Sequence, residues 1–585
     1  MKQVFGYFKP YKWHALLGPL FKLLEATFEL IVPIIVGLIV DRGLGVQVDG
    51  KYPNADFTYI LWMCVLLAAF GLFGCLFAVI AQYFAARTAT GVSAQLRSDL
   101  FKKMQSLSYR DFDRLGTGTM LTRLTSDVDR VQSGINLALR LFLRSPFIVF
   151  GAVITAWIVD PGSVLTFVLT VVALAIVVFS VMLGCMPLYK KSQEDLDKVT
   201  LSTRESLSGV RVIRAFCREE TEEKTFDVRN EQLTKSRKTV GVLAAITNPL
   251  TYVLVNAGIL LLLWTGALRV DGGSMSQGTV IALYNLMTQI LIELIKFANL
   301  IVTVAKAVAC AKRVEQVLDL QPSLEVDEDS GEAAVEDSER FVVFDDVSVR
   351  YTDGADCALE HISFTVAKGQ TVGIIGGTGS GKTTLVNLIP HFYDVCGGQV
   401  LIDGKNVREK SMQTYLRERI GIVPQKAILF RGTIRENLLF GRADATDEEL
   451  WAALKIAQAE EVVQEKGGLD APVEQGGRNF SGGQKQRLTI ARALVRKPDI
   501  LILDDSSSAL DYATDAALKK ALNGLDTTVF IVSQRTSSMQ GAHQIIVLDD
   551  GEAVGIGTHE TLMETCDVYR AIHQSQASTA KGGGV

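Results

Sequence analysis

The stretch GGTGSGKTT, from Gly376 to Thr384, decides the fold of the second half of this chain. It carries the spacing G-x-x-x-x-G-K-T, in which the glycines let backbone N–H groups close around phosphate oxygens. Lys382 supplies a positive charge for the outer phosphates, and the Thr383 hydroxyl is suited to ligate Mg²⁺. The apolar run GQTVGII precedes the loop and KTTLVNLI follows it. This pattern predicts a strand, a phosphate-binding loop and a helix whose N-terminus favours an anion.

Two further motifs in the same half also point to a nucleotide. The run ILILDD (Ile500–Asp505) predicts a buried strand that ends in acid, as a site for Mg²⁺ and a nucleotide needs. Between the two motifs, FSGGQKQRLTIARAL (Phe480–Leu494) opens a helix whose free N–H groups can hold a phosphate. One nucleotide needs only one phosphate-binding loop and one such helix start. We therefore expect a dimer in which each nucleotide lies between one chain's loop and the other chain's SGGQ.

The composition places the other half of the chain in a membrane. Of 585 residues, 48% are hydrophobic and 21% charged, and the first 305 contain long runs with almost no charge. A membrane helix needs about 20 apolar residues, and six stretches qualify. They are Trp13–Val40, Thr58–Ala86, Leu141–Val159, Pro161–Tyr189, Thr239–Leu268 and Ser276–Ala305. The net charge of −5 gives no sign of nucleic-acid binding, and eight scattered cysteines argue against a zinc site or a disulfide scaffold.

Basic residues predict how the chain crosses the bilayer. The stretches Arg87–Arg140 and Lys190–Lys238 are rich in Arg and Lys, whereas the connections on the opposite side are short or less basic. By the positive-inside rule, both termini and these two long connections are cytoplasmic. We expect a multi-pass protein of the cell (plasma or inner) membrane whose helices extend into the cytosol.

A few charged residues lie within the predicted spans. Glu25 and Glu29 are four apart on one helix, close to Lys22, and Glu293 lies three residues from Lys296. Ionisable groups within a membrane face the bundle interior or a water-filled cavity. Two interpretations stay open, a polar patch in a translocation path and a pairing role near a helix end.

The domain organisation follows from these patterns. We expect a transmembrane domain over residues 1–315, an acidic linker over 316–340, a nucleotide-binding domain over 341–574 and a flexible tail over 575–585. The linker contains EVDEDSGEAAVEDSE (Glu325–Glu339), which has no basic residue and is typical of a solvated segment.

In the order and spacing of these motifs the chain resembles an ABC exporter half-transporter, and the resemblance covers nearly its whole length. It implies a polytopic six-helix membrane domain joined to an α/β P-loop NTPase domain with a helical subdomain, and ATP and Mg²⁺ as cofactors. The segments FDRLGTGTMLTRLTSDV (Phe112–Val128) and ESLSGVRVIRAFCRE (Glu205–Glu219) resemble the two cytoplasmic connections that carry coupling helices.

The resemblance also assigns roles to single residues of the nucleotide site. Tyr351 corresponds to the aromatic that stacks on adenine, Gln425 to the Q-loop glutamine, Asp504 to the Walker B aspartate and Asp511 to the D-loop aspartate. Thr383, Gln425 and Asp504 would contact Mg²⁺. The Walker A residues are Gly376, Gly377, Thr378, Gly379, Ser380, Gly381, Lys382, Thr383 and Thr384, and the signature residues are Ser481, Gly482, Gly483 and Gln484.

Two catalytic positions depart from the family. Asp505 stands where the family has a glutamate that orients or deprotonates the attacking water, and Gln534 stands where it has a switch histidine. Aspartate is one methylene shorter, and glutamine cannot hold a positive charge. We therefore expect a degenerate site that binds ATP and hydrolyses it slowly. Some family members are heterodimers with one such site, and the intact SGGQ of this chain fits completion of the partner's active site.

Other functions remain open at this stage. The expected exporter of amphipathic small molecules or lipids competes with an importer built on the exporter fold, of the siderophore type. It also competes with a homodimeric exporter of slow ATPase activity and with a regulatory subunit that binds ATP without turning it over. The motifs decide neither the substrate nor the direction of transport.

Overall fold

The computed structural model describes residues 2–44, 55–324, 326–328, 338–351 and 356–582. Most of the expected acidic stretch, Glu325–Glu339, lies outside the described residues. The chain divides into two compact units. One is helical and consists of Met1–Gln105 and Thr117–Leu320, and the other contains the sheets and consists of Gln321–Val585 together with Ser106–Gly116. The sheet unit therefore includes a short segment that the sequence places in a connection of the membrane domain.

The helical unit contains six stretches that are long and apolar enough to cross a membrane, among the residues described. They are Val4–Leu44, Phe57–Ser106, Thr117–Val159, Pro161–Ser208, Glu219–Asp271 and Gln277–Leu318. A helix rises 1.5 Å per residue, so the 53-residue stretch is about 80 Å long. The hydrocarbon core of a bilayer is only about 30 Å thick. The helices therefore extend well beyond the membrane, as the basic connections predict.

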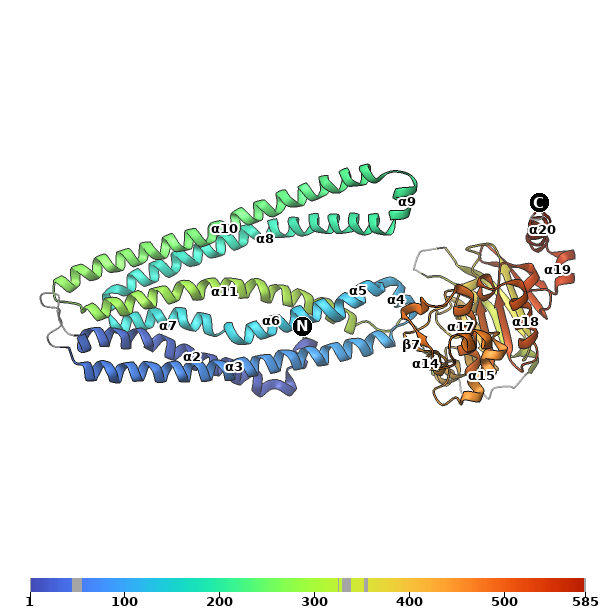
Figure 1. Ribbon diagram of the computed structural model, residues 1–585, viewed down its shortest axis with the longest axis horizontal. Coiled ribbons are helices and arrows are strands. Elements are labelled where there is room, and N and C mark those ends of the chain that lie inside the picture. The colour runs from blue at the N-terminus through green and yellow to red at the C-terminus, as the bar shows by residue number, and fades with distance from the viewer. Residues whose placement is uncertain (1, 45–54, 325, 329–337, 352–355, 583–585) are drawn as a thin grey trace. The chain divides into compact units, whose positions relative to one another are not determined.

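Long and short helices build these stretches (Figure 1). Those of 14 residues or more are α2 (Lys12–Leu38), α3 (Phe57–Ser106), α6 (Val128–Leu141), α7 (Arg144–Val159), α8 (Val164–Ser208), α10 (Glu219–Asp271) and α11 (Gln277–Leu318). The shorter segments are α1 (Lys2–Gly6), η1 (Lys9–Tyr11), η2 (Ile39–Leu44), α5 (Thr117–Thr122), η3 (Arg123–Asp127), η4 (Pro161–Ser163) and α9 (Val210–Ala215).

The helices of this unit pack as two groups that share α11. Helices α8 and α10 lie side by side along their length (Figure 1), while α11 contacts α2, α6 and α7. Leu283, Leu286 and Ile290 on α11 are fully buried in the apolar core of the unit. Near the start of α11, a Cβ on Gly278 would lie 2.0 Å from the carbonyl oxygen of Gly37, so only glycine permits this close approach of α11 to α2.

The second unit is built on a mostly parallel sheet of six strands, in the order β12-β11-β3-β10-β9-β6, in which only β12 runs antiparallel to its neighbour. A second, antiparallel sheet has the order β2-β1-β4-β5, and β7 pairs with β8. The strands are β1 (Val342–Val349), β2 (Leu359–Val366), β3 (Thr371–Gly376), β4 (Gly397–Ile402), β5 (Lys405–Asn406), β6 (Ile420–Val423), β7 (Gly432–Thr433), β8 (Pro472–Val473), β9 (Ile500–Asp504), β10 (Thr528–Val532), β11 (Gln544–Asp549) and β12 (Glu552–Gly557).

Helices accompany these sheets. They are α4 (Tyr109–Leu115), η5 (Ser338–Arg340), α12 (Lys382–Leu388), α13 (Met412–Arg419), α14 (Ile434–Leu439), α15 (Asp447–Ile456), α16 (Glu460–Glu465), η6 (Gln475–Gly477), α17 (Gly482–Val495), η7 (Ser506–Ala509), α18 (Tyr512–Leu522), η8 (Thr536–Ser538), α19 (His559–Thr565) and α20 (Asp567–Gly582). Residues 575–582, which the sequence assigns to a flexible tail, continue α20.

The strand order brings three distant motifs to one edge of the large sheet. Strands β3, β9 and β10 are buried along their whole length, as expected of parallel strands covered on both faces. Strand β10 pairs with β3 on one side and β9 on the other, with Val532 opposite both Ile374 and Asp504. The segments that follow these strands therefore meet at their carboxyl ends, where ligands bind in open α/β sheets.

Candidate nucleotide site

The loop between β3 and α12 has an open face lined by backbone. Gly379 and Gly381 have φ values of 88° and 94°, in the left-handed region that favours glycine. A Cβ built at Gly379 would meet nothing within 4 Å. The loop thus leaves room for a ligand beside its backbone, which fits the triphosphate of ATP.

Lys382 lies across this loop. Its Nζ donates to the carbonyl oxygens of Gly376, at 3.0 Å, and Gly377, at 2.5 Å. Burial lowers the pKa of Lys382 from its usual value, and the charges of Asp505 and Asp504 oppose that shift. The ammonium group is therefore held at the mouth of the loop beside two carboxylates, where a phosphate would add a further anionic partner.

Thr383 and Asp504 meet between the loop and β9. The Thr383 hydroxyl lies 3.1 Å from both carboxylate oxygens of Asp504, which is only 7% exposed. Burial raises the pKa of Asp504, and the neighbouring charge of Asp505 adds to this, while Thr383 and Lys382 oppose it. A hydroxyl beside a carboxylate is an oxygen-donor set of the kind that Mg²⁺ prefers, with waters and phosphates as its other ligands.

Asp505 adopts an unusual backbone conformation next to Gln425. Its φ is 47°, in the left-handed region, and its N–H donates to the carbonyl oxygen of Val532 at 3.0 Å. The Nε2 of Gln425 donates to the Asp505 carboxylate at 3.3 Å. Strained backbone is common at active sites. The structure therefore brings Gln425 from the end of β6 to the second of the two aspartates.

Gln534 follows β10 at the same edge of the sheet. Its side chain is exposed, and its backbone oxygen accepts a hydrogen bond from Gln576 at 2.6 Å. One further predicted residue, Tyr351, lies beside the loop. Tyr351 is exposed, and its hydroxyl lies 2.7 Å from the Thr384 hydroxyl. Its ring is therefore next to the first turn of α12.

The signature residues make their own local structure. Ser481 caps α17 by accepting from the N–H of Gln484 at 3.3 Å, and the Gln484 side chain accepts from the Ser481 N–H at 3.0 Å. Asp511 caps α18 by accepting from the N–H of Thr514. Within the part of the chain that the structure describes, no hydrogen bond joins these residues to the Walker residues. They are the predicted site residues that one chain does not bring to the loop.

Sequence reasoning did not single out a contact made by α4. The hydroxyl of Tyr393 donates to the carboxylate of Asp113 at 2.8 Å, and Tyr109 stacks on Phe392 with ring centroids 4.5 Å apart. Tyr393 also lies edge-on to Tyr351 at 5.1 Å. The aromatic pair of Phe392 and Tyr393 shortly after α12 was the available signal. This contact connects α4, which follows the long helix α3, to the surroundings of the nucleotide loop.

We expect the change Tyr393→Phe to weaken the coupling of ATP hydrolysis to transport by roughly 3- to 10-fold. The variant keeps the ring but removes the hydroxyl bonded to a carboxylate, and such bonds contribute about 1.5–3 kcal/mol when fully formed. The measurement is the stimulation of ATPase activity by transported solute in the reconstituted transporter. Tyr415→Phe is the matched control, because that hydroxyl bonds Asp499 inside the same domain. Equal losses in both variants would contradict a role of α4.

In the helical unit, the charged residues predicted as two clusters are paired, and Arg144 joins them. Arg144 donates to Glu29 at 2.7 Å and to Glu293 at 2.8 Å. Ser145 and Lys296 also donate to Glu293, and Lys22 donates to Glu25. This arrangement favours the pairing interpretation. A lone arginine in an otherwise apolar stretch was the signal that identifies such a partner.

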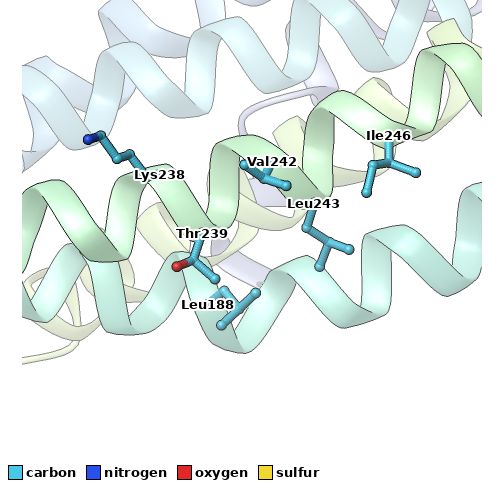
Figure 2. A pocket seen from close by; sticks show the side chains of 6 residues that line it. All are labelled: Leu188, Lys238, Thr239, Val242, Leu243 and Ile246. Atoms are coloured by element: carbon cyan, nitrogen blue, oxygen red, sulfur yellow. The ribbon is translucent and has the colours of Figure 1, made fainter.

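An apolar groove lies between α8 and α10 in the helical unit (Figure 2). It is lined by Leu188, Lys238, Thr239, Val242, Leu243 and Ile246. Five of these six side chains come from α10, and Leu188 lies opposite them on α8 (Figure 2).

Comparison with known proteins agrees with this division. Residues 15–294 match the family model of the ABC transporter transmembrane region, and residues 359–508 match that of the ABC transporter. An uncharacterized ABC transporter ATP-binding protein of Mycobacterium tuberculosis is 36% identical over 99% of this chain and 98% of its own length. An ATP-dependent lipid A-core flippase of Syntrophus aciditrophicus is 33% identical, over 84% of this chain and 82% of its own.

A solved structure shares the fold. The structure of a bacterial Atm1-family ABC exporter with ATP bound superimposes with a TM-score of 0.79, covering 97% of this chain and 98% of that one at 24% identity. With the two family models and the full-length relative, this places the chain among the ABC transporters, as a half-transporter of the exporter-type fold in which a six-helix membrane domain is fused to an ATP-hydrolysing nucleotide-binding domain.

Proposed function

We propose that this chain is the degenerate-site subunit of a heterodimeric ATP-driven exporter in the cell membrane, with both termini cytoplasmic. Its own Walker site binds ATP with Mg²⁺ and hydrolyses it slowly. Its signature residues, Ser481 to Gln484, complete the active site of a second half-transporter. The observation that carries this proposal is the pair of short or neutral groups, Asp505 and Gln534, at an otherwise complete nucleotide site.

The binding residues support retention of ATP. Lys382 and the open loop would hold the phosphates, and Tyr351 would contact the adenine. Thr383, Gln425 and Asp504 would hold Mg²⁺, which supplies charge neutralisation for the phosphates when bound. Asp504 and Thr383 already contact each other, and Gln425 lies within reach of Asp505. Two of the three proposed Mg²⁺ ligands, Thr383 and Asp504, therefore lie next to each other.

The catalytic residues support slow hydrolysis. An aspartate at 505 places its carboxylate roughly 1.5 Å further from the attacking water than a glutamate would, if the backbone is unchanged. A misplacement of about 1 Å can reduce a rate by about 100-fold, and a positioned general base contributes roughly 10²–10⁴-fold. The bond from Gln425 further occupies the Asp505 carboxylate. Gln534 can donate a hydrogen bond to a phosphate, but it carries no positive charge.

An ATP-driven exporter acts on a transported solute. We propose amphipathic small molecules or lipids, because one relative carries the name of a lipid A-core flippase. The ATP-driven cycle would act by alternating access, in which nucleotide binds two conformations with different affinity. The two cytoplasmic connections would carry this change to the membrane helices.

The test is ATPase activity of this chain copurified with its partner half-transporter. We expect Asp505→Ala to change the turnover by less than about 2-fold, because this carboxylate is not the productive base. We expect replacement of the partner's Walker B glutamate by glutamine to reduce turnover by at least about 100-fold.

Two results would contradict the proposal. If Asp505→Ala abolishes turnover, the site of this chain is catalytic and a homodimer is favoured. If the complex has no ATPase activity even with transported solute, the chain belongs to a regulatory complex. Vesicle uptake measured in both directions separates export from import.

A further inference from the structure

The C-terminal helix reaches the segment that follows β10. Helices α19 and α20 lie together (Figure 1), and α20 contacts β11 and η8. From α20, the side chain of Gln576 extends to Gln534 and Thr536, on either side of Arg535. Residues 534–536 follow β10, next to the ends of β3 and β9, where the nucleotide loop and the two aspartates lie.

Both ends of the Gln576 amide are used in this contact. Its Nε2 donates to the backbone oxygen of Gln534 at 2.6 Å. Its Oε1 accepts from the backbone N–H of Thr536 at 2.9 Å and from the Thr536 hydroxyl at 3.0 Å. One side chain thus satisfies three polar groups of a segment that is not part of any strand. A glutamine amide is suited to this because it both donates and accepts.

The same segment is held from its other side as well. The Ser533 hydroxyl accepts from the N–H of Arg535 at 3.0 Å and lies 3.2 Å from the Ser507 hydroxyl, in the turn after Asp505. Thr536 is buried, and its hydroxyl also lies 3.0 Å from Nδ1 of His573 on α20. The hydroxyl has one proton, so when it donates to Gln576 it accepts from His573. Hydrogen bonds therefore hold the backbone on both sides of Gln534, while its side chain is exposed.

We propose that Gln576 is a positioning residue, which fixes the backbone on both sides of Gln534 and so sets where the Gln534 side chain lies at the nucleotide site. The C-terminal helix α20 thereby controls the position of residues 534–536, which we call the switch segment. We call the hydrogen bonds of Gln576 to Gln534 and Thr536 the clamp. The clamp rests on these contacts alone, whereas its effect on ATP retention rests on the proposed function of the site.

Hydrogen exchange of the full-length transporter tests the clamp directly. In Gln576→Ala, the protection of the Thr536 amide should fall by roughly 10-fold or more, since each hydrogen bond typically changes an equilibrium by about 2- to 12-fold. Gln574→Ala is the matched control, because Gln574 lies two residues away on the same helix and is exposed. It should leave the protection unchanged. Equal protection of Thr536 in the wild type and Gln576→Ala would overturn the proposal.

Gln576→Glu separates the two halves of the clamp. A carboxylate still accepts from the Thr536 N–H and hydroxyl, but it cannot donate to the Gln534 oxygen. We expect protection at Thr536 to be largely kept. Loss as large as in Gln576→Ala would overturn the assignment of Oε1 as the acceptor.

The rate at which ATP dissociates from the site of this chain provides the functional measurement. We expect it to increase about 3- to 10-fold in Gln576→Ala and to stay unchanged in Gln574→Ala, with the same thermal unfolding midpoint in both. If Thr536 loses protection but ATP dissociates at the wild-type rate, the positioning role at the nucleotide site is overturned. If ATP dissociates fast from the wild type as well, the proposed holding function fails, while the exchange result still decides the clamp.

Discussion

Replacement of Gly482 by aspartate is expected to reduce the ATPase activity of the complete transporter by at least about 100-fold, although every Walker residue of this chain stays intact. Gly482 is the first residue of α17, and its N–H belongs to the helix start that would face the nucleotide of the partner. A carboxylate placed about 4 Å from a phosphate costs about 4 kcal/mol at an effective dielectric constant near 20. That cost corresponds to a loss of roughly 10³-fold in binding.

The position suits this experiment because the substitution fits the folded chain. A Cβ at Gly482 would meet nothing within 4 Å, whereas a Cβ at Gly483 would lie 2.9 Å from the carbonyl oxygen of Ala509. An acid in the first turn of a helix stabilises that helix by about 0.3–1 kcal/mol. The domain should therefore fold, and its thermal unfolding midpoint checks this.

Gly482→Ala is the matched control, since it adds the Cβ without the charge. We expect it to keep at least about half of the ATPase activity. Normal turnover in Gly482→Asp would refute the proposed role of the signature residues. Equal loss in both variants would instead assign the effect to backbone geometry.

The second large effect is expected from Arg144→Leu, which should destabilise the helical unit by about 3 kcal/mol. Glu293 is only 3% exposed, and it would lose one of its two cationic partners, while Glu29 would lose its partner in a membrane span. Removal of one member of a buried ion pair typically costs about 3–5 kcal/mol. Lys296 still pairs with Glu293, which places the expected loss at the lower end. The measurement is thermal unfolding of the transporter in lipid nanodiscs.

Two controls identify the cause. The double variant Arg144→Leu with Glu293→Leu should recover most of the stability, because replacement of a whole buried pair by apolar residues is often neutral or stabilising. Lys224→Ala removes an exposed pair with Glu220, and such pairs contribute at most about 1 kcal/mol. If Arg144→Leu unfolds at the wild-type temperature, the ion pairs by which Arg144 joins α7 to α2 and α11 are not a source of stability.

Much of this chain follows from its sequence. Apolar runs of about 20 residues predict the six membrane-spanning helices, because a bilayer requires every backbone group to bond within its own segment. The glycine spacing from Gly376 to Thr383 predicts the strand, loop and helix around a phosphate. The acidic end of ILILDD likewise predicts the place of Asp504, and the structure has these elements at the expected positions.

Other contacts, in each of the two units, join residues that are far apart along the chain. The sequence did not predict that Arg144 on α7 joins Glu29 on α2 to Glu293 on α11. It also did not predict that Asp113 pairs with Tyr393 or that Gln576 contacts the segment of Gln534. Local spacing pairs Glu29 with Glu25 and Glu293 with Lys296, but it does not show which distant residue is the partner until the fold brings the two together.

The sequence by itself therefore determined the elements and the chemistry that local patterns encode, which are the membrane spans, the phosphate loop and the acids at the strand tip. Only the tertiary structure decided which distant side chains contact these segments, such as Gln576 at the segment of Gln534 and Tyr393 at α4. The physical reason is that backbone hydrogen bonding and hydrophobic periodicity act over a few residues. Side-chain pairs separated by tens to hundreds of residues depend instead on packing of the whole domain.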